Sequence, residues 1–402
     1  MTRDRAFKKI VRARMARTQE RYATARAALL GELAKKSPPR ARHDQTFALT
    51  RLLAGPDAPS EAWLLGLGGG VSFQYHAFTY AGAPPLVYIG TRCNPQYAYD
   101  ATFVERALDG LGYEAVVAEA TSAKKAERQL LEALEAGPVI CWVGREALLG
   151  LDAMGGATPW VVVVHDVEDG VAGVEDCRAG AIEVPLDRLA AARAAVKKQK
   201  HRIVGLGERR APNDDAVRIA VRRCVADLDG EVVLGGSKKN FGLAALEKWT
   251  RLVDDDGDAK GWPRLFGAGY GLLGGLRQLY AWVHASTDGA GFRPMYAEFL
   301  RATKAPALVE AAAVVEANGE AWRGLVDDVF AGPPVLGRAK KLLAKGSPTD
   351  PRALAALEDA ANDALDAAFA AELRGRLHER LTSLLAGERA ARDALAAFVE
   401  KS

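Results

Sequence analysis

The residues of this 402-residue chain whose chemistry stands out first are a histidine and a cysteine near the ends of a predicted hairpin. His165 and Asp166 close the apolar run Trp160–Val164, and Cys177 directly follows Asp176. If the hairpin brings these ends together, a thiolate beside an imidazole base could perform acyl transfer or amide hydrolysis. The alternative is that Cys177 is a core or rim cysteine beside a polar turn.

A second possible nucleophile is Cys93, because Arg92 beside it would lower the pKa of its thiol. His76 follows a glycine-rich run and could reach the cleft that this run is expected to line. The chain has no CxxC spacing, so we predict neither a zinc site nor a disulfide framework. Buried reduced thiols are the alternative interpretation for all four cysteines, which are Cys93, Cys141, Cys177 and Cys224.

The glycine-rich run lies within Ser60–Tyr75, SEAWLLGLGGGVSFQY. Glycine permits positive φ and close approach of a backbone or a ligand, so we expect a tight turn lining a cleft. The predicted ligand-binding residues of this cradle are Gly68, Gly69, Gly70, Gln74 and Tyr75. Close packing is the alternative. The run matches neither a dinucleotide fingerprint nor a P-loop, so nucleotide binding is not favoured.

Composition is typical of a globular protein, with 49% hydrophobic and 26% charged residues. No apolar stretch is long enough for a membrane span, and the N-terminus lacks the apolar segment of a signal peptide. We therefore expect a cytoplasmic protein without membrane contact, and the length predicts two or three domains.

The first 43 residues carry thirteen Lys and Arg against three Asp and Glu, a net charge of +10. The remainder therefore carries −7 of the overall +3. We interpret residues 1–36 as a basic helical segment that docks on a carrier protein or another acidic partner. A solvated segment packed on its own body is the alternative. Nucleic acid is a less favoured partner, because no DNA-binding motif is visible.

Hydrophobic periodicity predicts an α+β region followed by helices. We expect four parts: a basic helical arm at 1–40, an α+β domain with an antiparallel sheet at 41–207, an all-α domain at 208–334 and a helical extension at 335–402. The predicted strands are Leu86–Gly90, Glu114–Ala118, Pro138–Val143, Trp160–Val164, Val171–Val174 and Ile182–Val184. The predicted later helices are Val217–Leu228, Gly242–Val253, Tyr270–Ala285, Phe292–Thr303 and Ala307–Phe330.

The helical extension carries an apolar stripe at spacings of three and four residues. Such a stripe serves either packing against the body or the seam of a homo-oligomer, and the pattern does not distinguish them. Its members are Leu354, Leu357, Ala361, Leu365, Phe369, Leu373, Leu377 and Leu381.

Three landmarks in the region from His43 to Arg193 give a family resemblance. They are LGLGGGVSFQY, the strand GPVICW at Gly137–Trp142, and the hairpin WVVVV…GVAGVED followed by VPLDRLAAAR. Their order and spacing resemble the N-terminal domain of the butirosin biosynthesis protein H family. The region of about Asp214–Phe330, with DGAGFRPMYAEFL, resembles a domain of unknown function that commonly follows it.

This resemblance implies a papain-like fold of the cysteine-peptidase or acyltransferase type. It also implies transfer of an aminoacyl group from a carrier-protein thioester to an amine. The family pattern places a Cys nucleophile at Asp44, a His base at Pro159 and an Asp at Asp176. An aspartate cannot replace a thiolate in thioester exchange, and proline cannot transfer a proton. Nucleophile and base are therefore both lost.

We expect a catalytically degenerate protein that binds a small molecule, an acyl ligand or a protein in the family's cleft. The alternative is an acyltransferase or amide hydrolase with a rearranged Cys/His site. His43, Asp44 and Asp176 could together hold a metal, but residues so far apart in the sequence are weak evidence for a metal site. We predict no metal and no cofactor, and include His43 among the ligand-binding residues.

Overall fold

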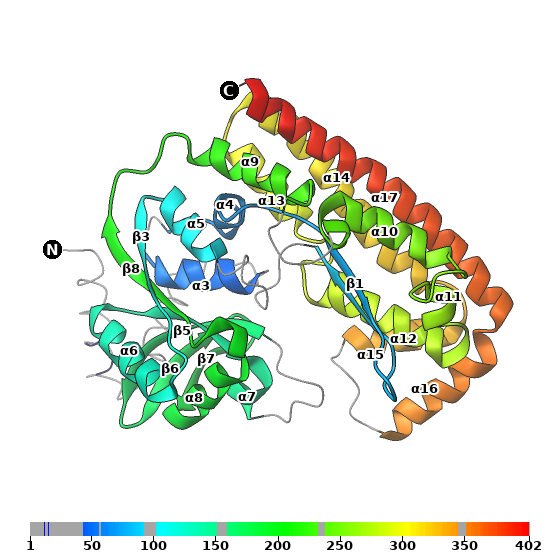
Figure 1. Ribbon diagram of the computed structural model, residues 1–402, viewed down its shortest axis with the longest axis horizontal. Coiled ribbons are helices and arrows are strands. Elements are labelled where there is room, and N and C mark those ends of the chain that lie inside the picture. The colour runs from blue at the N-terminus through cyan, green and yellow to red at the C-terminus, as the bar shows by residue number, and fades with distance from the viewer. Residues whose placement is uncertain are drawn as a thin grey trace. The chain divides into compact units, whose positions relative to one another are not determined.

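The computed structural model describes Arg12, Met15 and residues 43–55, 58–91, 102–150, 159–231, 238–344 and 351–401. The chain forms two compact units (Figure 1). Unit 1 comprises Met1–Gly68 and Asn94–Val217, and unit 2 comprises Gly69–Cys93 and Arg218–Ser402. Cys93, and the predicted basic segment 1–36 apart from Arg12 and Met15, lie outside the described residues.

Unit 1 is built on a six-stranded antiparallel sheet with the order β3-β8-β4-β5-β6-β7. Asp169 and Gly170, both with positive φ, make the turn that joins β5 to β6, as the Asp-Gly pair predicts. The strands are β3 (Tyr113–Ala118), β4 (Val139–Gly144), β5 (Pro159–Glu168), β6 (Val171–Asp176), β7 (Gly180–Pro185) and β8 (Ile203–Arg209).

The centre of this sheet is buried on both faces. All four valines of Val161–Val164 have no exposed surface, as the continuous apolar run predicts. Val162 and Val164 share a core cluster with Leu130 and Leu189, from the helices α6 (Ala123–Ala136) and α8 (Leu186–Ala195). The helix α3 (Asp44–Leu52) also packs on β5. Shorter helices complete unit 1: α4 (Glu61–Leu67), α5 (Thr102–Gly110), α7 (Arg145–Leu149) and the 3₁₀ turn η2 (Lys197–Gln199).

Unit 2 is a helical assembly that also contains the two-stranded antiparallel hairpin of β1 (Gln74–Phe78) and β2 (Leu86–Gly90). In Figure 1 the long helix α17 runs beside α14 and α10. The helices are α9 (Ala216–Leu228, which begins in unit 1), η3 (Lys238–Asn240), α10 (Gly242–Asp254), α11 (Trp262–Leu265), α12 (Gly269–Leu279), the π-helical η4 (Tyr280–Ala285), α13 (Arg293–Ala302), α14 (Pro306–Val329), α15 (Pro334–Ala344), α16 (Pro351–Ala364) and α17 (Ala367–Lys401).

The apolar stripe of the C-terminal region packs into the core of unit 2. Leu357 and Ala361 from α16, and Leu365 just after it, join Leu373, Leu377 and Leu381 from α17 in one cluster. Each is at most 5% exposed. The stripe therefore serves packing within the chain, the first of the two roles that its spacing allows.

The α+β class and the antiparallel sheet are confirmed, and each predicted strand is present. The sequence missed β1 and β8. The first follows the glycine run, and the second contains Gly205 and Gly207, which weaken a strand pattern. The papain-like fold stays a prediction. Among the helices in the described part of the chain, none is both long and apolar enough to cross a bilayer.

Candidate functional site

Asp44 lies at the first position of α3, and its carboxylate is held by backbone donors. Oδ1 accepts a hydrogen bond from the N–H of Gln45 at 2.9 Å, and Oδ2 accepts one from the N–H of Val161 at 3.2 Å. Asp44 is 9% exposed. A carboxylate is stabilised at a helix N-terminus by the unsatisfied N–H groups and the helix dipole. Asp44 thus binds the start of α3 to β5.

Pro159 opens β5, two residues before the Val161 N–H that Asp44 accepts. Asp176 ends β6 and has no exposed surface. Its Oδ2 accepts a bond from Trp160 Nε1 at 2.6 Å. Asp44, Pro159 and Asp176 therefore lie where α3 begins, β5 begins and β6 ends. Bonds from Val161 to Asp44 and from Trp160 to Asp176 link these three places.

The turn that follows Asp176 supplies two further hydrogen-bond donors to its carboxylate. Oδ1 accepts from the N–H groups of Arg178 at 2.7 Å and Ala179 at 2.6 Å. With Trp160 Nε1, three donors satisfy this side chain, so Asp176 closes a turn and orients an indole.

Two guanidinium groups lie over the ring of Trp160, which the sequence did not predict. The guanidinium carbons of Arg145 and Arg178 are 5.3 and 4.8 Å from the ring centroid. Arg145 Nε also lies 3.9 Å from Asp176 Oδ2. These contacts fix the indole at the start of β5, one residue after Pro159.

Cys177 directly follows Asp176 in the chain and is partly exposed. Burial raises the pKa of its thiol, and the negative charges of Asp44 and Asp176 raise it further. The positive charge of Arg178 acts in the opposite direction but does not reverse the shift. Because the thiolate is the nucleophilic form, this environment suppresses nucleophilic attack by Cys177.

The structure does not bring His165 to Cys177, so the ends of the hairpin do not form the Cys/His pair that was one of the two possibilities. His165 Nε2 lies 2.8 Å from Glu175 Oε2, and both side chains are buried. The β5–β6 register pairs Val163 with Glu175, which places Cys177 toward the start of β5 and His165 toward its end. A gap of about four residues along the strand corresponds to roughly 13 Å.

The two remaining described thiols are core residues. Cys141 on β4 and Cys224 on α9 have no exposed surface. Burial raises the pKa of each thiol to about 11. Neither thiol is therefore activated as a nucleophile.

His43 precedes α3 as its N-cap, and its Nδ1 accepts from the N–H of Thr46 at 3.3 Å. Its ring meets Phe103 edge-on at 5.5 Å between centroids. Its Nε2 lies 3.6 Å from Asp44 Oδ1. In the described ranges, no group of three or more His, Cys, Asp or Glu side chains is arranged to hold a metal ion, and this includes Asp44, His43 and Asp176.

The glycine run is explained by close packing at two positions. A Cβ on Gly68 would overlap the ring of Phe103, and a Cβ on Gly70 would lie 2.6 Å from Tyr296. Gly69 and Gly70 have positive φ, which favours glycine. Gly68 belongs to unit 1, whereas Gly69 and Gly70 belong to unit 2.

Gln74 and Tyr75 are core residues rather than exposed ligand contacts. Both have no exposed surface. The hydroxyl of Tyr75 accepts a bond from Trp262 Nε1 at 3.1 Å, and its ring stacks on Trp249. Gln74 forms an isolated bridge with Phe241. In this structure both side chains build the core of unit 2.

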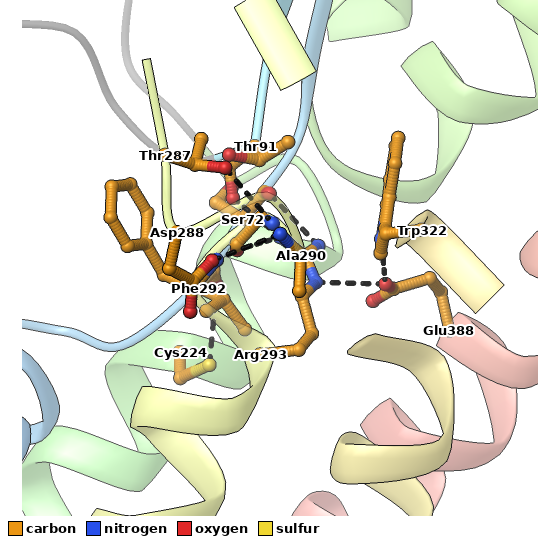
Figure 2. Close-up of polar contacts among 12 residues, drawn as sticks. Ser72, Thr91, Cys224, Thr287, Asp288, Ala290, Phe292, Arg293, Trp322 and Glu388 are labelled. Atoms are coloured by element: carbon orange, nitrogen blue, oxygen red, sulfur yellow. Dashed lines mark hydrogen bonds and ion pairs between the residues drawn. The ribbon is translucent and has the colours of Figure 1, made fainter. Parts of the chain in front are cut away.

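A buried arginine in unit 2 organises the segment after the glycine run (Figure 2). Arg293 Nε donates to Glu388 Oε1 at 2.9 Å, and Nη1 donates to the carbonyl of Thr91 at 2.7 Å. Nη2 donates to the carbonyl of Ser72 at 3.2 Å. The same Glu388 oxygen accepts from Trp322 Nε1 at 2.9 Å. Arg293 thereby ties both ends of the β1–β2 segment to α17.

The loop that presents Arg293 is itself held by side-chain caps. Asp288 Oδ1 accepts from the N–H groups of Ala290 and Phe292 at 3.0 and 2.9 Å, as Figure 2 shows. Phe292 has a φ of 62°. The sequence marked this DGAGFRP segment as a landmark without assigning a role to Arg293, and its role here is structural.

Two family models match the chain. Butirosin biosynthesis protein H, N-terminal, matches residues 43–177, and Domain of unknown function (DUF4872) matches residues 186–330. The first match begins at His43 and ends at Cys177, so it includes all three positions discussed above. The second begins with α8, earlier than the sequence landmarks indicate. A comparison with curated protein sequences found no match.

Proposed function

Because the chain carries the N-terminal domain of the butirosin biosynthesis protein H family followed by its associated domain, we propose that it is a catalytically degenerate member of this acyltransferase-type family. It acts as a binding or assembly protein through the family's cleft. The observation that supports this proposal is the carboxylate of Asp44 at the nucleophile position, occupied by two backbone N–H donors.

The neighbouring positions support the same interpretation. Pro159 has no proton to transfer, and Asp176 already accepts three hydrogen bonds. The three described thiols all have pKa values raised by burial. Acyl transfer through a thioester needs a thiolate and a base within hydrogen-bond reach. The described residues offer no such pair at this site.

The bound species in this proposal is a small molecule or acyl ligand in the cleft. A carrier protein, or another protein with an acidic surface, would dock on the basic residues 1–36. The ligand in the cleft follows from the family, and the acidic protein partner follows from the positive charge of residues 1–36. Removal of residues 2–36 should abolish salt-sensitive binding of an acidic carrier protein and leave ligand binding intact.

The test is the reactivity of each cysteine toward iodoacetamide as a function of pH, read by peptide mass spectrometry of the full chain. We expect slow labelling at Cys141, Cys177 and Cys224, with an onset above the ordinary thiol pKa. Asp44→Asn should accelerate labelling of Cys177, because it removes a charge that raises this pKa. Fast labelling of Cys93 near neutral pH would instead support the alternative acyltransferase or amide hydrolase.

A gain-of-function variant provides the matched control. Asp44→Cys places a thiol at the start of α3, where the helix dipole lowers the pKa. Adding Pro159→His supplies the base, so the double variant should react with iodoacetamide at lower pH than Asp44→Cys alone. If the double variant is no more reactive than the single one, β5 does not present its first residue to α3 as proposed.

A further inference from the structure

The β1–β2 hairpin lies within one family match but packs on residues of the other. Residues 71–91 fall inside the match to butirosin biosynthesis protein H, which covers residues 43–177. In the structure this segment belongs to unit 2, together with residues 218–330 of the match to the domain of unknown function. The second domain therefore contacts a segment that lies far outside its own sequence.

One face of the hairpin is buried among tryptophan side chains of the helices. The hairpin residues of this face are Phe73, Tyr75, Ala77, Val87 and Ile89. Each is at most 5% exposed, and they share one core cluster with Trp249, Trp262 and Trp322. An isolated two-stranded hairpin is at best marginally stable in water. Burial of this face against the helices is therefore what keeps the hairpin folded.

Two side chains of the helices bind the backbone of β2. Gln278 Oε1 accepts a hydrogen bond from the N–H of Val87 at 2.7 Å, and its Nε2 donates to the carbonyl of Pro85 at 3.0 Å. Trp282 Nε1 donates to the carbonyl of Val87 at 2.8 Å. A strand at the edge of a sheet otherwise presents a row of unpaired backbone groups. These side chains take the place of a third strand.

The base of the hairpin is also bound through its backbone. Arg293 donates to the carbonyls of Ser72 and Thr91, one at each end of the hairpin (Figure 2). The N–H of Gly242 donates to the carbonyl of Phe73 at 2.8 Å. Hydrogen bonds from a charged donor are stronger than those between neutral groups. The helices therefore bind main-chain groups on both strands.

Two irregular stretches of backbone carry the side chains that bind the hairpin. Trp282 lies in the π-helical turn η4, and such turns are rare and frequent at functional sites. Phe292, directly before Arg293, has a left-handed φ of 62°. Strain of this kind persists where the surrounding structure enforces it, commonly at binding sites. Both irregularities are explained if the helices are shaped to reach the hairpin backbone.

The helices of unit 2 also pack on one another. The helix α14 packs on α13 and α17, and α10 packs on α17. Val326 of α14 and Leu377 of α17 lie in the core cluster. By contrast, the bonds that Gln278 and Arg293 make to the hairpin join residues 191 to 221 positions apart. Such contacts form only after a long loop has closed. The helices therefore have contacts of their own that do not depend on the hairpin.

We propose that the domain of unknown function in this chain is a docking site for the β1–β2 hairpin, which docks and undocks as one module while the helices stay folded. The occupant is residues 71–91 of the same chain, bound through its backbone and its apolar face. Supersecondary motifs often open as cooperative units below the free energy of global unfolding. The hairpin and its docking residues all lie in unit 2, so ligand binding in unit 1 is not needed for docking.

The test is amide hydrogen exchange of the full chain, followed by mass spectrometry at increasing urea below the unfolding midpoint. In the wild type, amides of β1 and β2 should exchange through a partial opening, faster than those of α14 and α17. Gln278→Leu removes both bonds to β2 and should speed exchange of the hairpin amides about tenfold, without changing α14 or α17. Trp282→Phe keeps a ring beside Tyr88 but removes the N–H donor, and should speed hairpin exchange several-fold.

The matched control is Arg277→Leu. Arg277 is the neighbouring half-buried residue of α12, and its Nη1 donates to the hydroxyl of Tyr270 at 3.2 Å rather than to the hairpin. This control should leave hairpin exchange unchanged. If hairpin and α17 amides exchange at one rate in the wild type and accelerate together in Gln278→Leu, the hairpin opens only when the whole unit unfolds. That result, or equal acceleration of the hairpin by Arg277→Leu, overturns the proposal.

Discussion

The carboxylate of Asp44 accepts a hydrogen bond from the backbone N–H of Val161 at 3.2 Å. This bond joins the start of α3 to β5, the strand that begins with Pro159. The same side chain accepts the Gln45 N–H at 2.9 Å. Asp44 thus connects the start of α3 to β5.

This connection predicts a measurable contribution to stability. Asp44→Ala should lower the free energy of unfolding by about 1–2 kcal/mol, since it removes a helix-terminal acceptor and leaves the Val161 N–H buried without that partner. Urea unfolding, with the change read as a shift in midpoint at constant m, measures the loss.

The control for this prediction is Asp187→Ala. Asp187 lies in the first turn of α8, and its Oδ1 also accepts the N–H of the next residue, at 2.7 Å. It is exposed, and that bond is within its own helix. Its removal should cost about 0.5 kcal/mol, near the lower end for such caps. Equal losses in both variants would contradict a role for the bond to Val161.

Gly68 and Gly70 of the glycine run, together with Gly82 in the turn between β1 and β2, predict a ranked series of alanine substitutions. Gly82→Ala places a side chain at a φ of 72° in open space, so backbone strain alone should cost about 1–2 kcal/mol. Gly68→Ala has an ordinary φ of −69° but overlaps Phe103, so packing alone should cost about 1–3 kcal/mol. Gly70→Ala combines a φ of 71° with Tyr296 at 2.6 Å and should be the most destabilising.

Chemical denaturation of the three variants checks the order. The comparison is informative because one substitution isolates backbone strain, one isolates packing, and the third contains both. If Gly70→Ala were no worse than Gly82→Ala, Tyr296 would have room to move, and the close packing at Gly70 would not explain the glycine.

His76 predicts an acid-dependent loss of stability. Burial, reinforced by Lys248 and Lys260, lowers its pKa from 6.5 to about 4. Between these values the unfolded chain binds a proton that the folded chain does not, so stability falls as the pH drops from about 6.5 to 4. Because the imidazole is partly exposed, we allow for solvent screening and expect about 1–2 kcal/mol.

The measurement is urea unfolding of the wild type and His76→Gln at several pH values in this window. The variant should show a smaller decrease in stability on acidification. Lys248→Gln should raise the pKa of His76, read from the imidazole proton shifts, because it removes one of the two cations. An identical pH profile in His76→Gln would assign the acid sensitivity to other groups.

The sequence alone determined the class of the fold and the elements with strong periodicity. Trp160–Val164 predicts a strand buried on both faces, because a continuous run of β-branched residues is typical of strands that are covered on both sides. The structure confirms this burial for Val161–Val164. The family was also readable, since its landmarks are local strings of residues, and both matches confirm it. The expectation that Asp44 and Pro159 stand at the family's Cys and His positions rests on equally local strings and needed no structure.

Only the tertiary structure decided which of these residues meet. Periodicity specifies the buried face of a strand but not its register, so the sequence left open whether His165 meets Cys177. The pairing of Val163 with Glu175 places His165 beside Glu175 instead. Likewise, the C-terminal stripe is compatible with a homo-oligomer until Leu365 and Leu381 are seen in the core. Arg293 carries no sequence signal, because burial of a guanidinium depends on carbonyl groups that the fold brings from distant segments.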